Sequence, residues 1–141
     1  MMKLSEHFSL SEFEHSVTAI RCNIDNSVPS ELIPLLRNLC EKVLEPLRQH
    51  VGEPVIISSG YRCPELNRRV GGASNSQHLT GEAADICVGN TPKLRQWYLW
   101  MVDNLPFDQL IWEKKGKKCW IHVSCKLDLS LNRHKAFKLS I

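Results

Sequence analysis

The spacing of hydrophobic positions along the chain predicts a mixture of helices and strands. Over residues 30–49, leucine and valine recur every three or four positions, which is the spacing of one helical face. Pro46 removes one backbone donor from this helix and predicts a kink near residues 42–45. Residues 91–103 show the same spacing after a threonine N-cap and a proline, so they predict a second core-packing helix.

Shorter runs of alternating or β-branched residues predict four strands, near residues 54–58, 82–88, 107–113 and 118–124. The last two flank a lysine-rich turn and predict a hairpin. Gly116 suits the first position of a two-residue type II′ turn with Lys117, and such a turn pairs Lys115 with Lys118.

Short helices are predicted over residues 11–15 and 64–70, whereas residues 126–141 show no clear period and receive no assignment. The pattern as a whole predicts an α+β fold: an antiparallel sheet with helices packed on one side and the functional site on the open face. Residues 1–141 are expected to form a single domain.

Composition excludes several classes of protein. With 43% hydrophobic and 23% charged residues the chain is neither disordered nor a membrane protein, and a net charge of +3 is too small to indicate nucleic acid binding. No membrane span and no signal-peptide pattern is found, so synthesis in the cytoplasm is expected, as is a monomer. The six cysteines lack a C-x-x-C pair, which favours free thiols.

The most informative stretch contains His78 and Asp85, seven positions apart. In an extended strand Asp85 points out of the sheet among small neighbours, and Gly81 permits a turn that folds His78 back over it. A second imidazole is available at His122, within an alternating segment. Two imidazoles and a carboxylate suit a catalytic zinc, which takes three protein ligands and leaves a fourth position for water.

These residues carry a resemblance to a known family. The pattern Ser76-x-His78-x-x-Gly81-x-Ala83-x-Asp85, followed by Trp120-Ile121-His122, resembles the M15 zinc peptidases, a group that includes D-Ala-D-Ala carboxypeptidases, dipeptidases and phage endolysins. The similarity runs roughly over residues 8–124, and residues 107–113 are also similar to a strand of the zinc-bearing hedgehog domain. The resemblance implies a Zn²⁺ cofactor, the ligands His78, Asp85 and His122, and peptidoglycan peptides as substrates.

Two further residues are predicted to bind substrate. Arg62 follows a strand end, and its planar guanidinium suits a carboxylate; a surface salt bridge with Glu65 is the alternative. The arginine of this S-G-Y-R segment binds substrate in the family, so the resemblance favours the first role. Ser76 either hydrogen-bonds the substrate or orders its loop, and the resemblance again favours substrate binding.

The general base is where the sequence departs from parts of the family. Cys119 stands where the dipeptidase branch has a glutamate, and Trp120 stands where another branch has a second histidine. Glu113 is the predicted catalytic base, because the type II′ turn makes it a diagonal neighbour of His122 on one face, roughly 7–8 Å away at the backbone. A three-residue loop would put Glu113 on the opposite face. Alternatively, Glu113 pairs with nearby lysines at the surface.

The predicted function is therefore a zinc metallopeptidase that hydrolyses peptide bonds of bacterial peptidoglycan stem peptides or cross-links. A phage lysis enzyme, which acts on the cell wall after release, would fit the absence of a signal peptide. The alternative is a non-catalytic, zinc-stabilised module that binds cell wall or protein, because a domain can keep metal ligands and lose the chemistry. A cysteine-based redox or zinc protein is disfavoured, because the thiols lack ligand spacing.

Overall fold

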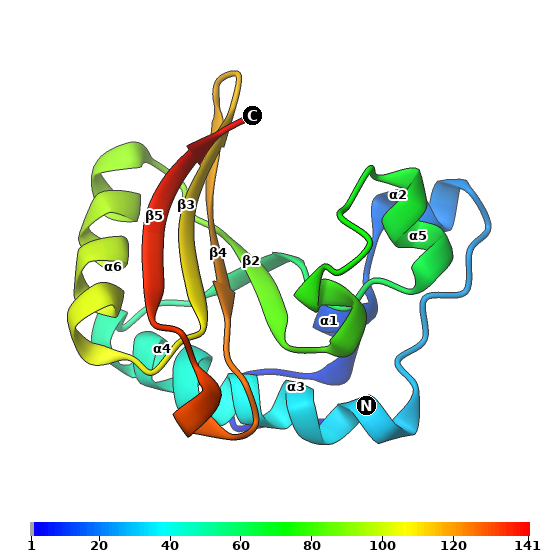
Figure 1. Cartoon of the computed structure of the whole chain (residues 1–141), viewed down its shortest axis with the longest axis horizontal. Coiled ribbons are helices and arrows are strands. Elements are labelled where there is room, and N and C mark those ends of the chain that lie inside the picture. The colour runs from blue at the N-terminus through cyan, green and yellow to red at the C-terminus, as the bar shows by residue number, and fades with distance from the viewer. Residues whose placement is uncertain (1) are drawn as a thin grey trace.

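The computed structural model describes residues 2–141 and has an α+β architecture built on a five-stranded sheet (Figure 1). The strands lie in the order β1 (Ile56–Ser59), β2 (Ala83–Cys87), β4 (Lys118–Ser124), β3 (Gln109–Lys115) and β5 (Lys135–Ser140). Every neighbouring pair is antiparallel except β3 and β5, which are parallel. The expected fold class is confirmed, and β5 arises in the segment that received no assignment.

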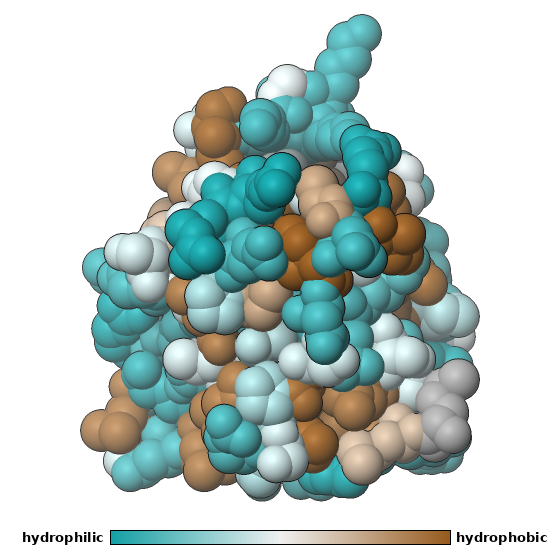
Figure 2. Space-filling model, turned by 90° about the vertical axis from the view of Figure 1, so that its right-hand side faces the viewer, coloured by the Kyte–Doolittle hydropathy of each residue, from teal (hydrophilic) through white to brown (hydrophobic). Residues whose placement is uncertain are grey.

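The hairpin between β3 and β4 has the predicted register, with Lys115 opposite Lys118 and Glu113 opposite Trp120. Gly116 has φ +61°, whereas Lys117 is absent from the residues with positive φ, as a type II′ turn requires at these positions. The hairpin tip is the highest point in Figure 1, and Figure 2 shows a hydrophilic projection at this height. Its lysines are therefore solvated, as expected for a turn.

The predicted long helix is present but divided into four segments: η1 (Ser30–Leu32), α3 (Ile33–Leu39), a π-helical turn η2 (Cys40–Leu44) and α4 (Glu45–Val51). The irregular turn ends two residues before Pro46 and overlaps residues 42–45, where the kink was predicted. The ring of Pro46 would clash with the carbonyl of Lys42 in a regular helix, and the wider π turn removes that conflict.

The remaining helices are α1 (Leu10–Glu14), α2 (Val17–Arg21), α5 (Pro64–Arg69) and α6 (Thr91–Asn104), with 3₁₀ turns η3 (Gln77–Thr80) and η4 (Leu129–Leu131). Three of these correspond to the helices predicted over residues 11–15, 64–70 and 91–103. Helix α2 was not predicted. Among residues 2–141, no helix has both the length and the apolar character that crossing a membrane requires.

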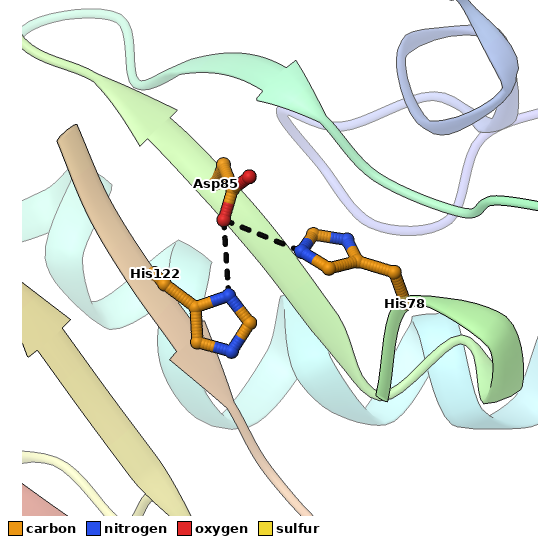
Figure 3. A group of neighbouring side chains, drawn as sticks. All are labelled: His78, Asp85 and His122. Carbon is orange, nitrogen blue, oxygen red and sulfur yellow. Dashed lines mark hydrogen bonds and ion pairs between the residues drawn. The ribbon is translucent and has the colours of Figure 1, made fainter. Parts of the chain in front are cut away.

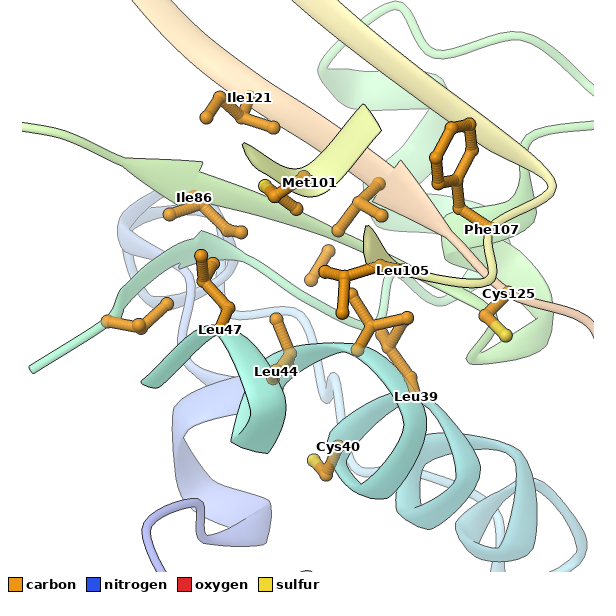
Figure 4. Close-up of a cluster of buried hydrophobic side chains, with 14 of the residues drawn as sticks. Leu39, Cys40, Leu44, Leu47, Ile86, Met101, Leu105, Phe107, Ile121 and Cys125 are labelled. Carbon is orange, nitrogen blue, oxygen red and sulfur yellow. The ribbon is translucent and has the colours of Figure 1, made fainter. Parts of the chain in front are cut away.

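The hydrophobic core fills the space between one face of the sheet and helices α3, α4 and α6 (Figure 4). Strand alternation supplies Ile86 and Ile121 to this face, where they meet Leu47 and Met101, all fully buried. Cys40 is buried in the same core, and burial raises the pKa of its thiol to about 12. Cys40 therefore serves as a small core residue rather than as a reactive thiol.

The opposite face of the sheet is not bare. Helices α1, α2 and α5 lie across from it, at the right in Figure 1. The space between is a groove of about 1340 Å³, lined by residues of α2 and α5 on one wall and of β3 and β4 on the other. The functional site predicted for the open face thus lies inside a groove.

Candidate metal centre and substrate groove

Three segments bring His78, Asp85 and His122 together on the groove side of the sheet (Figure 3). Asp85 on β2 and His122 on β4 are direct cross-strand partners. Asp85 Oδ1 lies 3.0 Å from His122 Nδ1 and 3.3 Å from His78 Nε2. One donor atom from each residue lies within 4.8 Å of the others, so the structure forms the predicted group, which is suited to hold a metal ion.

The His78 ring is oriented by its second nitrogen. Nδ1–H donates to the Gly60 carbonyl at 2.7 Å, which leaves Nε2 directed at Asp85. Ser76 caps the 3₁₀ turn that carries His78, because its Oγ accepts a hydrogen bond from His78 N at 3.2 Å. Gly81 ends the turn with φ +76°, in the way the sequence predicted.

The three side chains are largely shielded from water: the exposed fractions are 2% for His78, 15% for Asp85 and 11% for His122. Burial alone would raise the pKa of Asp85, but the two imidazoles outweigh burial and hold this pKa well below its usual value. The carboxylate is therefore ionised. Two imidazole nitrogens and one carboxylate oxygen at the wall of a groove form a donor set that fits a catalytic zinc.

Glu113 lies on the same face, two positions from Ile111, the cross-strand partner of His122. Burial raises the pKa of Glu113, and the Asp85 carboxylate adds to the shift. His122, Trp120 and His78 oppose the rise without cancelling it. Glu113 takes part in none of the ion pairs found among residues 2–141, so the surface alternative, pairing with lysines, is not what the structure shows.

Arg62 lines the groove and is linked to the metal group through the backbone, since its N–H donates to the His78 carbonyl at 3.1 Å. Its Nη1 donates to Asn67 Oδ1 at 3.2 Å, so its partner is Asn67 rather than the alternative Glu65. Arg62 Nε is buried without a hydrogen-bond partner among residues 2–141. Burial lowers the pKa of this guanidinium, against the opposing influence of Asp85 and Glu113. A buried, unpaired donor of this kind gains from binding an anion.

Gly72 packs against this arginine so closely that a side chain would not fit. An added Cβ would lie 2.7 Å from Arg62 Nη1 and nearer still to Asn67 Oδ1. The glycine is therefore needed for the close approach of the backbone, and it helps to place Arg62.

Ser76 also lines the groove. The structure shows its loop-ordering role through the cap on the 3₁₀ turn. Its second role, hydrogen bonding to substrate, stays a prediction, as do the roles of Arg62 and Glu113 and the assignment of the three metal ligands.

One polar cluster in the groove was missed by sequence reasoning. Asp108 is fully buried and pairs with Arg133, while Gln77 also donates to it. Asp108 and Arg133 are 25 positions apart. No local pattern joins them, because the contact depends on the β3–β5 pairing, in a segment whose spacing predicted no strand.

The fold and the site together define the class: an α+β protein with a histidine–aspartate–histidine group, suited to hold a metal ion, in a groove that also contains a carboxylate and an arginine. The chain belongs to the peptidase M15 family, because the model of the family described as Peptidase M15 matches residues 6–124. A curated relative, the zinc D-Ala-D-Ala carboxypeptidase of Streptomyces albus G, is 42% identical over 48 residues. That match covers 33% of this chain and 19% of the relative.

These comparisons confirm the family that the motif resemblance implied. They also confirm, together with the donor set, zinc as the expected cofactor. Because the match to this relative covers a short part of both chains, the particular bond and substrate are proposed from the site.

Proposed function

We propose that this protein is a zinc peptidase that hydrolyses peptide bonds in the stem peptides or cross-links of bacterial peptidoglycan. The observation that carries the proposal is the convergence of His78, Asp85 and His122 in a groove that also contains Glu113 and Arg62. Family membership supports peptidase chemistry, and the Streptomyces relative, by its name, acts on D-Ala-D-Ala.

His78, Asp85 and His122 would hold the zinc ion, which would supply a Lewis acid for activating water and polarising the scissile carbonyl. In this proposal Glu113 takes a proton from the attacking water and delivers it to the leaving amine. Its raised pKa suits both steps, because a base with a pKa nearer the working pH also returns the proton readily. Arg62 holds a substrate carboxylate through its planar fork.

The groove extends past the metal group in both directions, which favours an extended peptide over a compact ligand. Lys115 and Ile141 contribute to its lining, as do Lys126 and Leu131 from the segment that follows β4. Lys115 lies past Glu113 on strand β3, and Lys126 lies past His122, just after strand β4. The groove can therefore accommodate substrate residues on both sides of the bond that is cut.

The test is incubation of zinc-loaded protein with intact peptidoglycan, followed by mass spectrometry of the released fragments. We expect fragments with new amino and carboxyl ends at one defined bond, and none after chelation. Binding to peptidoglycan without any new ends would contradict the proposal and favour the zinc-stabilised binding module. The fragment masses also separate a carboxypeptidase, which releases one terminal residue, from an endopeptidase.

A further inference from the structure

The buried carboxylate of Asp108 holds Arg133 in a fixed position at the groove. Arg133 donates to it from Nε at 3.0 Å, from Nη2 at 2.8 Å and from its backbone N at 2.8 Å. Gln77 Nε2 donates to the same carboxylate at 2.9 Å. The Asp108 side chain is 0% exposed, and the hydrogen bonds from Arg133 hold its pKa well below the usual value. Both members of the ion pair are therefore charged at neutral pH.

The other edge of the Arg133 guanidinium faces away from Asp108. A guanidinium has five N–H donors, and Asp108 accepts from only two of its nitrogens, Nε and Nη2. The side chain of Arg133 is 53% exposed, and Arg133 and Gln77 both line the groove. An arginine fixed along one edge by a buried carboxylate and open along the other is preorganised for a second, bidentate partner.

The position of this arginine relative to the metal group follows from strand register. On the groove face of β3, Gln109 and Glu113 lie on either side of Ile111, the partner of His122. Each step of two residues covers ~7 Å along the strand. Asp108 immediately precedes Gln109, and Gln77 immediately precedes His78. Arg133 therefore lies on the opposite side of the metal group from Glu113.

The charged side chains in this part of the groove nearly balance one another. Asp108 neutralises Arg133, but Lys126 lines the groove as well, and its backbone N–H donates to Asn132 Oδ1 at 2.8 Å, which ties it to the residue before Arg133. Glu82 also lines this end of the groove, where its carbonyl accepts from Cys125 N, and its carboxylate offsets the charge of Lys126. An anion is therefore attracted by the free N–H donors of Arg133 and not by a net charge. Arg62, by contrast, interacts electrostatically with Asp85 and Glu113, near the metal group itself.

We propose that Arg133 forms a second carboxylate-binding subsite, distinct from that of Arg62, which recognises an acidic residue of the substrate across the metal group from Glu113. The inference rests on the proposed function, and it narrows the substrate class to peptides that carry a further free carboxylate beside the bond that is cut. The ion pair with Asp108 also anchors the segment that leads into β5. A purely structural anchoring role explains the edge of the Arg133 guanidinium that contacts Asp108. It does not explain the edge that faces the groove.

The test uses a peptidoglycan-type pentapeptide and a set of analogues in which each carboxylate in turn is replaced by a carboxamide. Dissociation constants are measured by calorimetry, and kcat/KM is measured on the same peptides. The proteins compared are the parent, Arg133→Gln, Arg133→Lys and the control Arg95→Gln. Arg95 is an exposed residue of α6 that does not line the groove. Its replacement by glutamine makes the same change in net charge as Arg133→Gln, but away from the groove.

We expect that replacing one internal carboxylate of the peptide by a carboxamide weakens binding to the parent protein by about 10- to 100-fold, the range for a charge-assisted pair. In Arg133→Gln this penalty falls below about 3-fold, while the penalty for the carboxylate bound by Arg62 persists. Arg133→Lys retains part of the discrimination, and Arg95→Gln retains all of it. Loss of an anchoring contact would lower stability without changing discrimination between paired peptides.

Full discrimination in Arg133→Gln, or no internal penalty in the parent, would overturn the subsite. If Arg133→Gln fails to fold because Asp108 is left unpaired, the double variant Asp108→Asn/Arg133→Gln removes both charges and serves in its place. Peptides that bind with the expected preference but are never cut would refute the proposed function and leave the subsite standing. Cleavage without any preference between the carboxylate and carboxamide peptides would support the proposed function and overturn the subsite.

Discussion

At the scale of single residues, the site depends on side chains whose environments differ although they share one face of the sheet. Asp85 is held ionised by two imidazoles, whereas burial and the Asp85 charge raise the pKa of Glu113. Two carboxylates close to one metal group are thereby separated in acidity, which is a common way of dividing the roles of ligand and base.

The first prediction concerns Glu113. Replacement by glutamine keeps the shape of the side chain and removes its basicity, so hydrolysis should fall by about two to four orders of magnitude while zinc content stays unchanged. Turnover and metal content are measured on the same preparations. Glu41→Gln, at an exposed position on η2, is the matched control and should retain full activity. Near-normal activity of Glu113→Gln would place the base elsewhere.

The second prediction concerns the metal ligands. His78→Ala and His122→Ala should each lose stoichiometric zinc, because two donors do not complete a catalytic site. Elemental analysis measures the metal, and circular dichroism verifies the fold. His50→Ala removes an exposed imidazole that stacks on Trp100, far in sequence from the three ligands, and should keep its zinc. Retention of zinc by either folded ligand variant would mean that the ion binds at another place.

At the scale of elements, short irregular segments rather than long helices place the reactive groups. The 3₁₀ turn η3 carries His78, and the loop after β1 carries both Gly60, whose carbonyl orients His78, and Arg62. Strands β2 and β4 supply Asp85 and His122 by cross-strand pairing. Loops anchored at strand ends on a rigid sheet commonly hold functional groups in this way.

The third prediction tests the loop that supports Arg62. Gly72→Ala would press a methyl group onto Asn67 and Arg62, so the guanidinium must shift, and we expect KM to rise about 10-fold or more with modest loss of stability. Steady-state kinetics and thermal denaturation provide the two measurements. Gly89→Ala is the control, because its added Cβ meets nothing within 4 Å. Equal KM values in the two variants would show that Gly72 does not support substrate binding.

At the scale of the whole molecule, the core and the metal group lie on opposite faces of one sheet. The buried cluster includes Leu44, Leu47 and Met101 from the helices and Ile86 and Ile121 from the strands, all of which face away from the groove. Stability from apolar burial is therefore independent of the metal.

The fourth prediction follows from this separation. Removal of zinc by a chelator should leave the protein folded, with unchanged far-ultraviolet circular dichroism, and should lower Tm by about 5 °C or more, because zinc binds only the folded state. Adding zinc back should restore Tm and activity together. An unfolded apoprotein would contradict the prediction and assign the metal a structural role like that in small zinc domains.

Much of this arrangement was determined by the sequence itself. The helical spacing of leucines, the strand alternation around Ile121 and the glycine of the hairpin turn are local patterns, and each is set by the geometry of neighbouring residues. The turn in particular determined the register, and hence which side of the sheet Glu113 occupies. The spacing of His78, Asp85 and His122 was informative for another reason: it resembles the motif of a known family and can be recognised from the sequence alone.

The tertiary structure decided what depends on contacts between distant segments. Strand β5 has every residue exposed and no internal period, so only its pairing with β3 makes it a strand. The same pairing brings Arg133 to Asp108, and the packing of α2 and α5 across from the sheet converts an open face into a groove. Hydrophobic spacing indicates which face of a helix or strand is buried. It does not indicate which remote side chains come into contact, because those contacts depend on the free energy of the whole folded chain.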